Sequence, residues 1–346
     1  MNFSDKLVDW YKINKRDLPW RKTRNAYYIW ISEVILQQTR VAQGLPYYLR
    51  FIEEFPLIED MAEASEEKIL KLWQGLGYYS RARNMHFTAK ELVRLYNGEF
   101  PSDYYNILSL KGVGPYTAAA IASFAFNLPY AVIDGNVIRV LSRVFGVDIS
   151  FNTNQGRKIF KELAQSLLLT SNADIYNQSI MEFGALQCTP KSPECYVCPM
   201  QSFCDAYNSN RIDLLPMKRK LNNIKNRFFH YLVIKTKQGI FFNKRNSGIW
   251  RGLYDFPFLE FSKDISNEKV LQHKSWSDFF NNQHIDVISI SDVYVHRLSH
   301  QNIYAKFWIV EGFFPTDTYK LVEFKKIFSL PVSRLTEKYL NSLELD

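Results

Sequence analysis

Leu110-Lys-Gly-Val-Gly-Pro-Tyr-Thr-Ala-Ala-Ala-Ile121 decides the fold, and an apolar run then leads to Val132-Ile-Asp-Gly-Asn-Val-Ile-Arg-Val140. Gly112 and Gly114 flank Val113, which predicts a turn too tight for a side chain at either glycine. Pro115 suits the first position of a helix, because its missing N–H would have no helical partner there. Such a turn points backbone N–H groups outward and forms an anion site; an ordinary helix–helix corner is the alternative.

Length and composition indicate a two-domain protein. The chain has 346 residues, with 47% hydrophobic and 16% aromatic residues, which is enough for packed cores. No segment reaches the roughly 18 uninterrupted apolar residues of a membrane span. Met1 to Trp10 carries charges and a helical pattern instead of a signal peptide. We therefore expect a cytoplasmic protein.

The net charge of +8 and the pI near 9.1 favour a polyanionic partner. The basic residues are clustered along the chain: Lys15, Arg16, Arg21, Lys22 and Arg24; Arg81 and Arg83; and Lys218, Arg219, Lys220, Lys225 and Arg227. The anion expected at the glycine turn is therefore a DNA phosphate.

Hydrophobic periodicity changes along the chain. Helices are predicted at residues 3–13, 26–38, 43–51, 66–72, 80–96, 154–168 and 172–186, and after both Gly114 and Asp134. Strands are predicted at residues 228–235, 240–244, 286–291, 293–297 and 303–312, with helices within 268–281 and 333–343. We expect a mainly α fold with a helical domain at 1–207, a basic interdomain linker at 208–227 and an α+β domain at 228–346.

Glu33 is set among Trp30, Val34 and Leu36 in a predicted helix, with Gln37 on the same face. Loss of solvation there would raise the pKa of its carboxyl group and let it act as a general acid. A surface glutamate on an amphipathic helix is the alternative, and it holds for most glutamates.

Asp134 precedes a helix, where its carboxylate can accept backbone N–H bonds and stay ionised. A plain helix cap is the alternative. If Glu33 is the acid and Asp134 the anion, their pKa values are pushed apart. Cleavage of an N-glycosidic bond needs both, because the leaving group must be protonated and the sugar cation stabilised.

Leu72-Trp-Gln-Gly-Leu-Gly-Tyr-Tyr-Ser-Arg-Ala-Arg-Asn84 is a glycine-broken loop that presents tyrosines beside arginines. Tyrosine offers a stacking face for bases, and arginine offers a phosphate contact. We expect Tyr78 to be the tyrosine that packs in the core.

Four cysteines, Cys188, Cys195, Cys198 and Cys204, lie within one short segment. In a cytoplasmic protein this crowding indicates a metal site, either structural zinc or an iron–sulfur cluster. Zinc ribbons usually show two close pairs, and this segment has only one. The spacing is similar to the 4Fe-4S loop of endonuclease III relatives, which favours the cluster.

Taken together, these motifs resemble the MutY-type adenine DNA glycosylases of the endonuclease III, helix-hairpin-helix superfamily. The resemblance covers nearly the whole chain. It implies base excision repair by a monomeric enzyme, in a bacterial cytoplasm and its nucleoid, that flips adenine out of duplex DNA and removes it where it is mispaired with 8-oxoguanine or guanine.

The resemblance also implies roles for individual residues. Glu33 matches the acid that protonates adenine, and Asp134 matches the carboxylate that stabilises the sugar cation or bonds to it transiently. Tyr116 stands where bifunctional relatives have a lysine for Schiff-base chemistry, so no strand cleavage is expected. Tyr79 and Gln38 match residues that enter the duplex around 8-oxoguanine. The wall of the adenine pocket is matched by Arg16, Trp20, Arg21, Leu36, Val41, Gln178 and Met181.

The C-terminal third resembles the family's Nudix-like lesion-reading domain. Gly248-Ile-Trp-Arg-Gly-Leu-Tyr-Asp-Phe-Pro257 fits its loop, and no glutamate-rich metal box follows, so nucleotide hydrolysis is not expected. The usual Phe-Ser-His reading loop stands here as Leu298-Ser299-His300. Ser299 and His300 can still hydrogen-bond to the lesion, while the aromatic wedge is lost.

Two other functions compete with adenine removal. A bifunctional glycosylase for oxidised pyrimidines would carry a lysine in place of Tyr116. A non-catalytic DNA-binding module that uses the cluster as a redox sensor would not need Glu33 or Asp134.

Overall fold

The computed structural model describes residues 2–217, 224–312 and 319–343, and the chain divides into two compact units. The first unit comprises Met1–Glu63 and Asn84–Lys220, and the second comprises Ala64–Arg83 and Leu221–Asp346. The predicted mainly helical fold followed by an α+β region is confirmed. Residues 64–83 differ from the expected boundaries, because they cluster with the C-terminal region.

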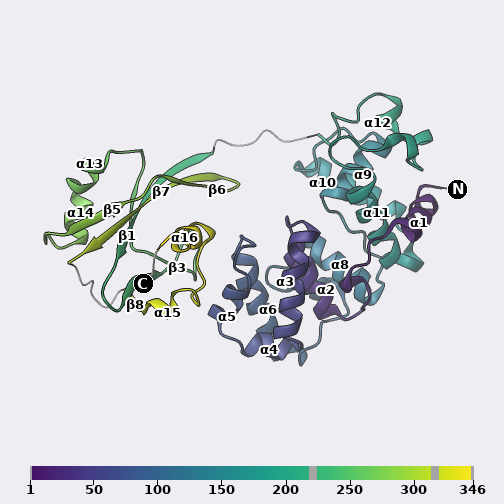
Figure 1. Ribbon diagram of the computed structural model, residues 1–346. Coiled ribbons are helices and arrows are strands. Elements are labelled where there is room, and N and C mark those ends of the chain that lie inside the picture. The colour runs from purple at the N-terminus through teal and green to yellow at the C-terminus, as the bar shows by residue number, and fades with distance from the viewer. Residues whose placement is uncertain (1, 218–223, 313–318, 344–346) are drawn as a thin grey trace. The chain divides into compact units, whose positions relative to one another are not determined.

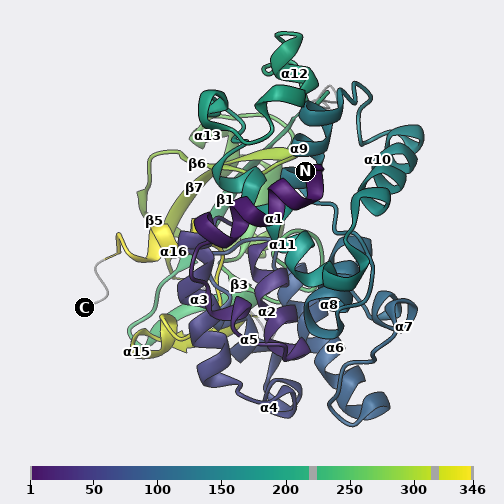
Figure 2. The same ribbon diagram turned by 90° about the vertical axis from the view of Figure 1, so that its right-hand side faces the viewer.

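The first unit is built from helices. Their bounds are α1 (Phe3–Asn14), η1 (Pro19–Arg21), α2 (Ala26–Leu36), α3 (Val41–Glu54), α4 (Ile58–Glu63), α6 (Ser80–Tyr96, which starts in the second unit), α7 (Tyr104–Ser109), α8 (Pro115–Phe126), α9 (Gly135–Phe145), α10 (Asn154–Leu167), η2 (Thr170–Asn172), α11 (Ala173–Leu186), η3 (Cys195–Val197), η4 (Gln201–Phe203) and α12 (Asp205–Asn208). Helix α1 lies beside α11, as Figure 2 shows, and Trp10 packs edge-on against Phe183.

Helix α2 is buried along most of its length, which explains its apolar residues on every side. It contacts α8 and α3. Asn25 caps its N-terminus by accepting hydrogen bonds from the backbone N–H groups of Tyr27 and Tyr28. This packing holds Glu33 inside the unit.

The predicted linker at 208–227 is wrong at both ends. Its first part packs on the helical unit: Leu215 is buried, and the Arg143 Nε–H donates to the carbonyl oxygens of Ile212 and Leu215, both at 3.1 Å. Strand β1 (Lys225–Ile234) begins before the predicted end. Lys218, Arg219 and Lys220 of the basic run lie outside the described residues.

In its described residues, the second unit contains α5, two sheets and four further helices. Their bounds are α5 (Glu66–Leu72), β1 (Lys225–Ile234), β2 (Gly239–Lys244), β3 (Tyr254–Asp255), β4 (Phe258–Phe261), α13 (Asn267–Leu271), α14 (Lys274–Phe279), β5 (Asp286–Ile290), β6 (Tyr294–Arg297), β7 (Gln301–Glu311), β8 (Lys320–Glu323), α15 (Phe324–Ile327) and α16 (Arg334–Leu340). The helix predicted within 268–281 is two short helices, because the chain turns at His273, whose ring accepts from the Ser275 N–H.

The larger sheet has the strand order β4-β1-β7-β5, and β6 also pairs with β7. Strands β1, β5, β6 and β7 are labelled in Figure 1. Strands β1 and β7 are parallel, and the other pairs of this sheet are antiparallel. The smaller sheet has the order β3-β2-β8. Strand β6 returns to β7 through the turn at Leu298, where the Leu298 N–H donates to the Gln301 carbonyl oxygen.

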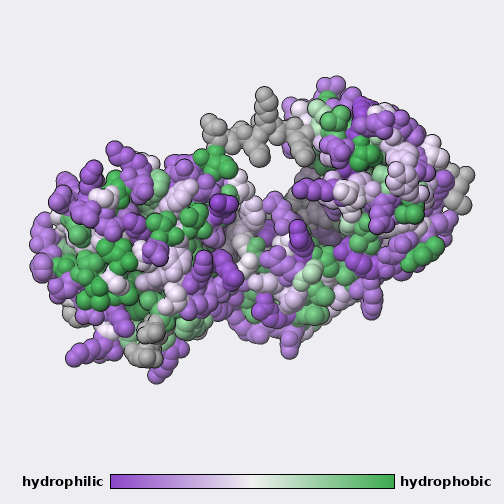
Figure 3. Space-filling model, turned by 45° about the horizontal axis from the view of Figure 1, so that its top comes forward, coloured by the Kyte–Doolittle hydropathy of each residue, from purple (hydrophilic) through white to green (hydrophobic). Residues whose placement is uncertain are grey.

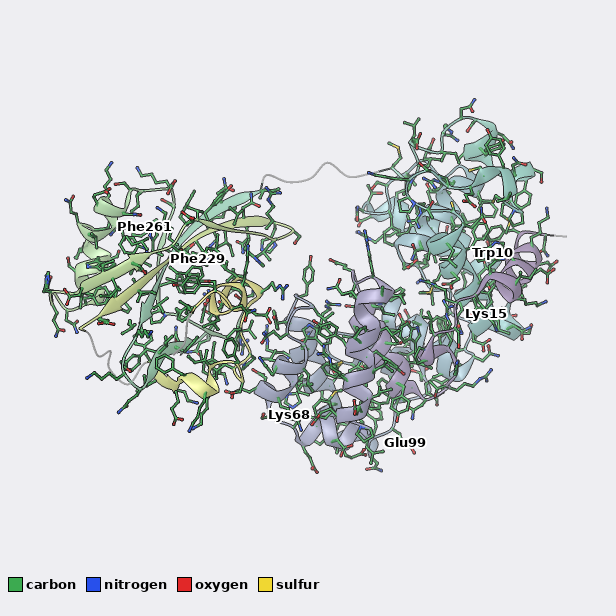
Figure 4. The ribbon with its side chains drawn as sticks, viewed as in Figure 1. Trp10, Lys15, Lys68, Glu99, Phe229 and Phe261 are labelled. Atoms are coloured by element: carbon green, nitrogen blue, oxygen red, sulfur yellow. The ribbon has the colours of Figure 1, made fainter. Side chains whose placement is uncertain are left out.

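Both faces of the larger sheet are covered by core residues. Along β1, Phe229 and Tyr231 join one apolar cluster, while Leu232 joins another, as expected from the alternation of side chains along a strand. Phe229 and Phe261, labelled in Figure 4, belong to these two different clusters. On the face seen in Figure 3, hydrophobic side chains form small groups among hydrophilic ones.

Candidate active site

A cavity of about 650 Å³ lies within the first unit. Helices η1, α2, α8 and α11 and the start of α9 contribute to its wall. The candidate residues that line it are Arg16, Trp20, Arg21, Glu33, Leu36, Val41, Tyr116, Asp134, Gln178 and Met181. The structure therefore brings the expected acid, the expected anion and the expected pocket wall to one site.

Glu33 is 5% exposed. Burial raises the pKa of its carboxyl group to about 7, even though a hydrogen bond from Tyr116 acts in the opposite direction. The negative charge of Asp134 raises this pKa further. The raised pKa confirms the effect expected from the apolar neighbours, and it keeps the carboxyl group protonated up to neutral pH.

Tyr116 makes a short hydrogen bond to the expected acid. Its O–H donates to Glu33 Oε2 at 2.5 Å. Burial and the nearby carboxyl groups raise the pKa of Tyr116, so the phenol keeps its proton. Since Oε2 is the acceptor in this bond, Oε1 is the oxygen left to carry the acidic proton of Glu33.

Asp134 caps α9, as expected. Its Oδ1 accepts from the Val137 N–H at 2.7 Å, and its Oδ2 accepts from the Asn136 side chain at 2.8 Å. The expected effect on ionisation is wrong, however. Burial raises the pKa of Asp134 above its ordinary value, although these hydrogen bonds lower it. Both carboxyl groups therefore shift in the same direction, because the depth of the cavity outweighs the helix cap.

Glu182, which the sequence patterns did not single out, organises one wall of the cavity. The side chains of Arg16 and Arg21 each donate two hydrogen bonds to the Glu182 carboxylate, at 2.6–3.0 Å. Burial acts to raise the pKa of Glu182, but the hydrogen bonds from Arg16 and Arg21 lower it to about 2. These arginines are therefore neutralised within the protein and are not free for phosphates. In the sequence, Glu182 lies four residues after Gln178 and therefore on the same helical face, and this spacing could have indicated that it lines the pocket.

A buried arginine, Arg139, links the Asp134 cap to the cysteine segment. Arg139 Nη2–H donates to Asn136 Oδ1 at 2.8 Å, and Arg139 Nε–H donates to the Cys188 carbonyl oxygen at 2.7 Å. The Gly184 carbonyl oxygen accepts from the same Nη2 at 2.6 Å. Arg139 thus fixes the start of α9 relative to the end of α11.

The four cysteines are free thiols in one neighbourhood. Cys195, Cys198 and Cys204 each interact electrostatically with Cys188, and burial raises the pKa of all three. Arg143 Nη1–H lies 3.6 Å from Cys188 Sγ. Within the described residues, no group of three Cys, His, Asp or Glu side chains meets the geometry of a single metal-ion site.

The glycine turn joins α7 to α8 as a helical hairpin, with Pro115 at the first position of α8. Gly112 has φ +78°, and a Cβ there would lie 2.7 Å from Asn84 Cβ. The expectation for Gly114 is wrong, because its φ is −93° and no heavy atom lies within 4 Å of a Cβ built there. Gly114 caps α8 without a side-chain hydrogen bond, so no side chain of the cap residue satisfies the first N–H groups of the helix.

The exposure expected of the neighbouring tyrosines is reversed. Tyr79 is 5% exposed, and its O–H donates to the Val332 carbonyl oxygen at 3.3 Å. Tyr78 is 49% exposed with φ +44°. The backbone has positive φ at Gly77 and Tyr78, and this turns the Tyr78 ring outward and the Tyr79 ring inward. Tyr78 is therefore the ring available for stacking, and Tyr79 is a core residue.

The other expected DNA contacts are at the surface. Gln38 is exposed with φ +59°, an unusual conformation for a residue other than glycine. Ser299 and His300 are exposed at the turn between β6 and β7, and Leu298 packs partly against the core of the second unit.

Comparison with known proteins identifies the family of the chain. A family model described as HhH-GPD superfamily base excision DNA repair protein matches residues 31–168. An adenine DNA glycosylase of Buchnera aphidicola subsp. Baizongia pistaciae is 37% identical over 313 residues, which cover 89% of this chain and 86% of that protein. The chain belongs to the adenine DNA glycosylase family.

Other relatives and solved structures are similar to a part of this chain. The Homo sapiens adenine DNA glycosylase is 42% identical over 213 residues, which cover 59% of this chain and 39% of that protein. Among solved structures, a thermostable thymine-DNA glycosylase has a TM-score of 0.56 and 32% identity and covers 60% of this chain and 95% of that one. An endonuclease III–DNA complex has a TM-score of 0.52 at 23% identity, which shows the fold alone.

Family membership makes the chain a DNA N-glycosylase of base excision repair, which is a hydrolase. This excludes a purely non-catalytic binding module as the function of the chain. Among the residues that the structure describes, no helix is both long and apolar enough to cross a membrane.

Proposed function

We propose that this adenine DNA glycosylase removes adenine paired with 8-oxoguanine, or with guanine, in duplex DNA and leaves an abasic site without cutting the strand. The observation that carries the proposal is the shared cavity of Glu33, Tyr116 and Asp134. Its volume of about 650 Å³ is in the range of small-molecule sites and accommodates a flipped purine nucleotide.

Glu33 is the general acid in this proposal. Its proton passes from Oε1 to a ring nitrogen of adenine while the bond between the base and the sugar breaks, and the bonding electrons leave with the base. The sugar becomes an oxocarbenium-like cation. Water then adds to it and gives its proton to the Glu33 carboxylate, which regenerates the acid. The raised pKa of Glu33 supports this role, because a glutamate ionised at neutral pH would have no proton to give.

Asp134 stabilises the cation in its ionised form. Its pKa is raised in the free protein, but it accepts hydrogen bonds from Val137 and Asn136 that favour the anion. A developing positive charge on the sugar favours the carboxylate further. We therefore expect Asp134 to be ionised as the bond breaks. Its carboxylate stabilises the sugar cation either electrostatically or through a transient covalent bond.

Tyr116 supports a monofunctional enzyme. A bifunctional glycosylase needs an amine that attacks the sugar and forms a Schiff base before the strand is cut. The phenol of Tyr116 cannot form a Schiff base, and it is occupied by its hydrogen bond to Glu33.

The other candidates bind the substrate. Arg16, Trp20, Arg21, Leu36, Val41, Gln178 and Met181 form the adenine pocket, and Gly112 and Gly114 bind a phosphate through the start of α8. Gln38 and Tyr78 enter the duplex, with Tyr78 replacing Tyr79 because of its exposure. Ser299 and His300 read the lesion from a Nudix-like domain, and the protein acts as a monomer on duplex DNA.

A 4Fe-4S cluster is proposed at Cys188, Cys195, Cys198 and Cys204. The interacting thiols fit such a group, and the nearby guanidinium of Arg143 suits the negative charge of four thiolates. When bound, the cluster would serve a structural role and order the loop between Cys188 and Cys204. Purified protein should absorb visible light and contain iron and sulfide; stoichiometric zinc in anaerobically purified protein would overturn the cluster.

The test of the function is base release from a labelled duplex with one 8-oxoguanine·adenine pair. Treatment with alkali should produce a break at adenine, and the untreated sample should stay intact. Glu33→Gln should slow release by about 10²–10⁴-fold, while the exposed Glu53→Gln control should match the parent. Equal rates for Glu33→Gln and the parent would refute the acid assignment, and strand breaks without alkali would favour a bifunctional enzyme.

A further inference from the structure

The loop that displays Tyr78 belongs to the second unit, although it is inserted in the sequence of the helical region. The chain leaves the first unit after Glu63 and returns to it at Asn84. Between these points lie α5 and the glycine-rich loop. Tyr78 is flanked by Gly77, with φ +69°, and its own φ is +44°. Such a backbone needs support from its surroundings to keep one conformation.

Gln74 supplies support on the N-terminal side of this loop. Its Nε2–H donates to Glu337 Oε1 on α16 at 2.7 Å. Its Oε1 accepts from the Val332 N–H and from Lys71 Nζ, both at 3.2 Å. One amide side chain thus fixes the loop to both the chain before α16 and α16 itself.

The C-terminal side of the loop is fixed to the same peptide segment. Tyr79 O–H donates to the carbonyl oxygen of Val332, whose N–H is bonded to Gln74. Trp73 is fully buried, and its Nε1–H donates to the Gly77 carbonyl oxygen at 2.9 Å. Tyr78 is therefore exposed between two fixed points.

Helix α5 is attached to the second unit before the loop begins. Glu67 accepts from Lys244 Nζ at 2.7 Å and from the Tyr254 O–H at 2.8 Å. Gly252 has φ +84°, and a Cβ there would lie 3.0 Å from both Glu66 Oε1 and Leu70 Cδ1. The Gly248–Pro257 loop is thus shaped to receive α5 closely.

We infer that Gln74 is a positioning residue that acts through Tyr78, and that the C-terminal region contributes to DNA recognition by holding this ring as well as by its own exposed turn at Ser299 and His300. The inference rests on the proposed function, because it requires Tyr78 to contact DNA. The hydrogen bonds to Val332 and Glu337 hold the Gln74–Tyr79 segment, so the ring is presented in one orientation without an ordering cost on binding.

A double-mutant cycle in the full-length chain tests the inference. Affinity is measured for a duplex with one 8-oxoguanine·adenine pair, with Glu33→Gln in every variant to keep the duplex intact. Tyr78→Ala should raise Kd roughly tenfold through loss of stacking. Gln74→Ala should raise Kd about fivefold when Tyr78 is present and less than about twofold when it is absent, since both changes remove the same contact.

A reciprocal exchange tests the hydrogen bond itself. Gln74→Glu alone places two carboxylates together and should weaken binding, whereas Gln74→Glu with Glu337→Gln restores a donor and an acceptor and should recover the parent Kd within about twofold. Glu323→Gln is the matched control, because it removes exposed ion pairs with Lys325 and Lys326 in the same unit and should leave Kd unchanged.

Equal effects of Gln74→Ala with and without Tyr78 would overturn the inference, as would an unchanged Kd in Tyr78→Ala. Neither result would touch the proposed chemistry, which depends on the separate comparison of the parent with Glu33→Gln in base release.

Discussion

Glu33 holds its proton because it is buried, and this predicts the pH dependence of the enzyme. Its pKa is about 7, so the acid form predominates below that pH and is lost as pH rises through it. Single-turnover rates, measured with enzyme in excess over the duplex, should fall about tenfold per pH unit above about pH 7. Tyr116→Phe removes a hydrogen bond that lowers this pKa, so the decline should move to higher pH. Rates independent of pH from about 6 to 9 would contradict Glu33 as the acid.

Glu182 is predicted to stabilise the fold as well as the pocket. Its side chain is 1% exposed, and Glu182→Gln would leave Arg16 and Arg21 without their counter-charge. The free energy of unfolding should fall by about 3 kcal/mol at neutral pH. Because its pKa is lowered to about 2 from 4.5, the difference from the parent should persist above about 4.5 and vanish as pH falls through about 2. Denaturant titrations of both proteins provide the measurement, and equal midpoints at neutral pH would disprove the assignment.

Residue patterns predicted some environments better than others. The apolar neighbours of Glu33 along one helix revealed its burial, since helical spacing fixes which side chains share a face. The helix cap at Asp134 was also predicted from the sequence. The raised pKa of the Asp134 carboxyl group was not, because it depends on cavity walls contributed by helices distant in the sequence. Glu182 was missed for the same reason, because its partners Arg16 and Arg21 lie far away in the sequence.

The helical hairpin offers a paired prediction, since its glycines serve different purposes. Gly112→Ala places a Cβ against Asn84 at φ +78° and should lower the free energy of unfolding by about 1–3 kcal/mol. Gly114→Ala meets no atom and should fold like the parent. If a phosphate approaches the start of α8, Gly114→Ala should still weaken duplex binding several-fold. Thermal unfolding and duplex titration separate these effects; normal DNA affinity in Gly114→Ala would remove the anion site.

Element boundaries were predicted closely where periodicity was strong, as for α5 and α6, which begin and end as expected. For the glycine-rich loop with Tyr78 and Tyr79, the prediction of which tyrosine is exposed was wrong. Its composition indicated a stacking surface, but the positive φ of Tyr78 decides which ring faces outward, and φ cannot be read from composition. A break in the helix at 268–281 was missed in a similar way, because the side chain of His273 caps a new helix there.

At the scale of the whole molecule, the attachment of residues 64–83 to the second unit predicts a response to truncation. A chain that ends at residue 217 lacks the partners of Glu67, Gln74 and Tyr79. Amide hydrogen exchange within 64–83 should accelerate about tenfold or more, while α9 and α11 should exchange as in the full chain. Unchanged protection in 64–83 would mean that the helical region holds this segment alone.

The division of the chain was the least predictable feature. Composition predicted one domain boundary, at the basic stretch 208–227, but Leu215 in this stretch packs on the helical unit. Residues 64–83, which are inserted in the helical region, cluster with strands far downstream in the sequence. Contacts of such long sequence separation leave no local pattern. They follow from complementary surfaces, such as Gly252 against α5, that only the folded chain displays.

The crossing of residues 64–83 into the second unit limits how such proteins can be recombined. A chimera that joins the first 217 residues of this chain to the C-terminal portion of a relative would pair α5 and the Gln74 amide with a foreign surface. Successful exchange of the lesion-reading portion should therefore require transplanting two separate stretches of gene together. Natural sequence change at Gln74 and Glu337 should for the same reason occur in concert.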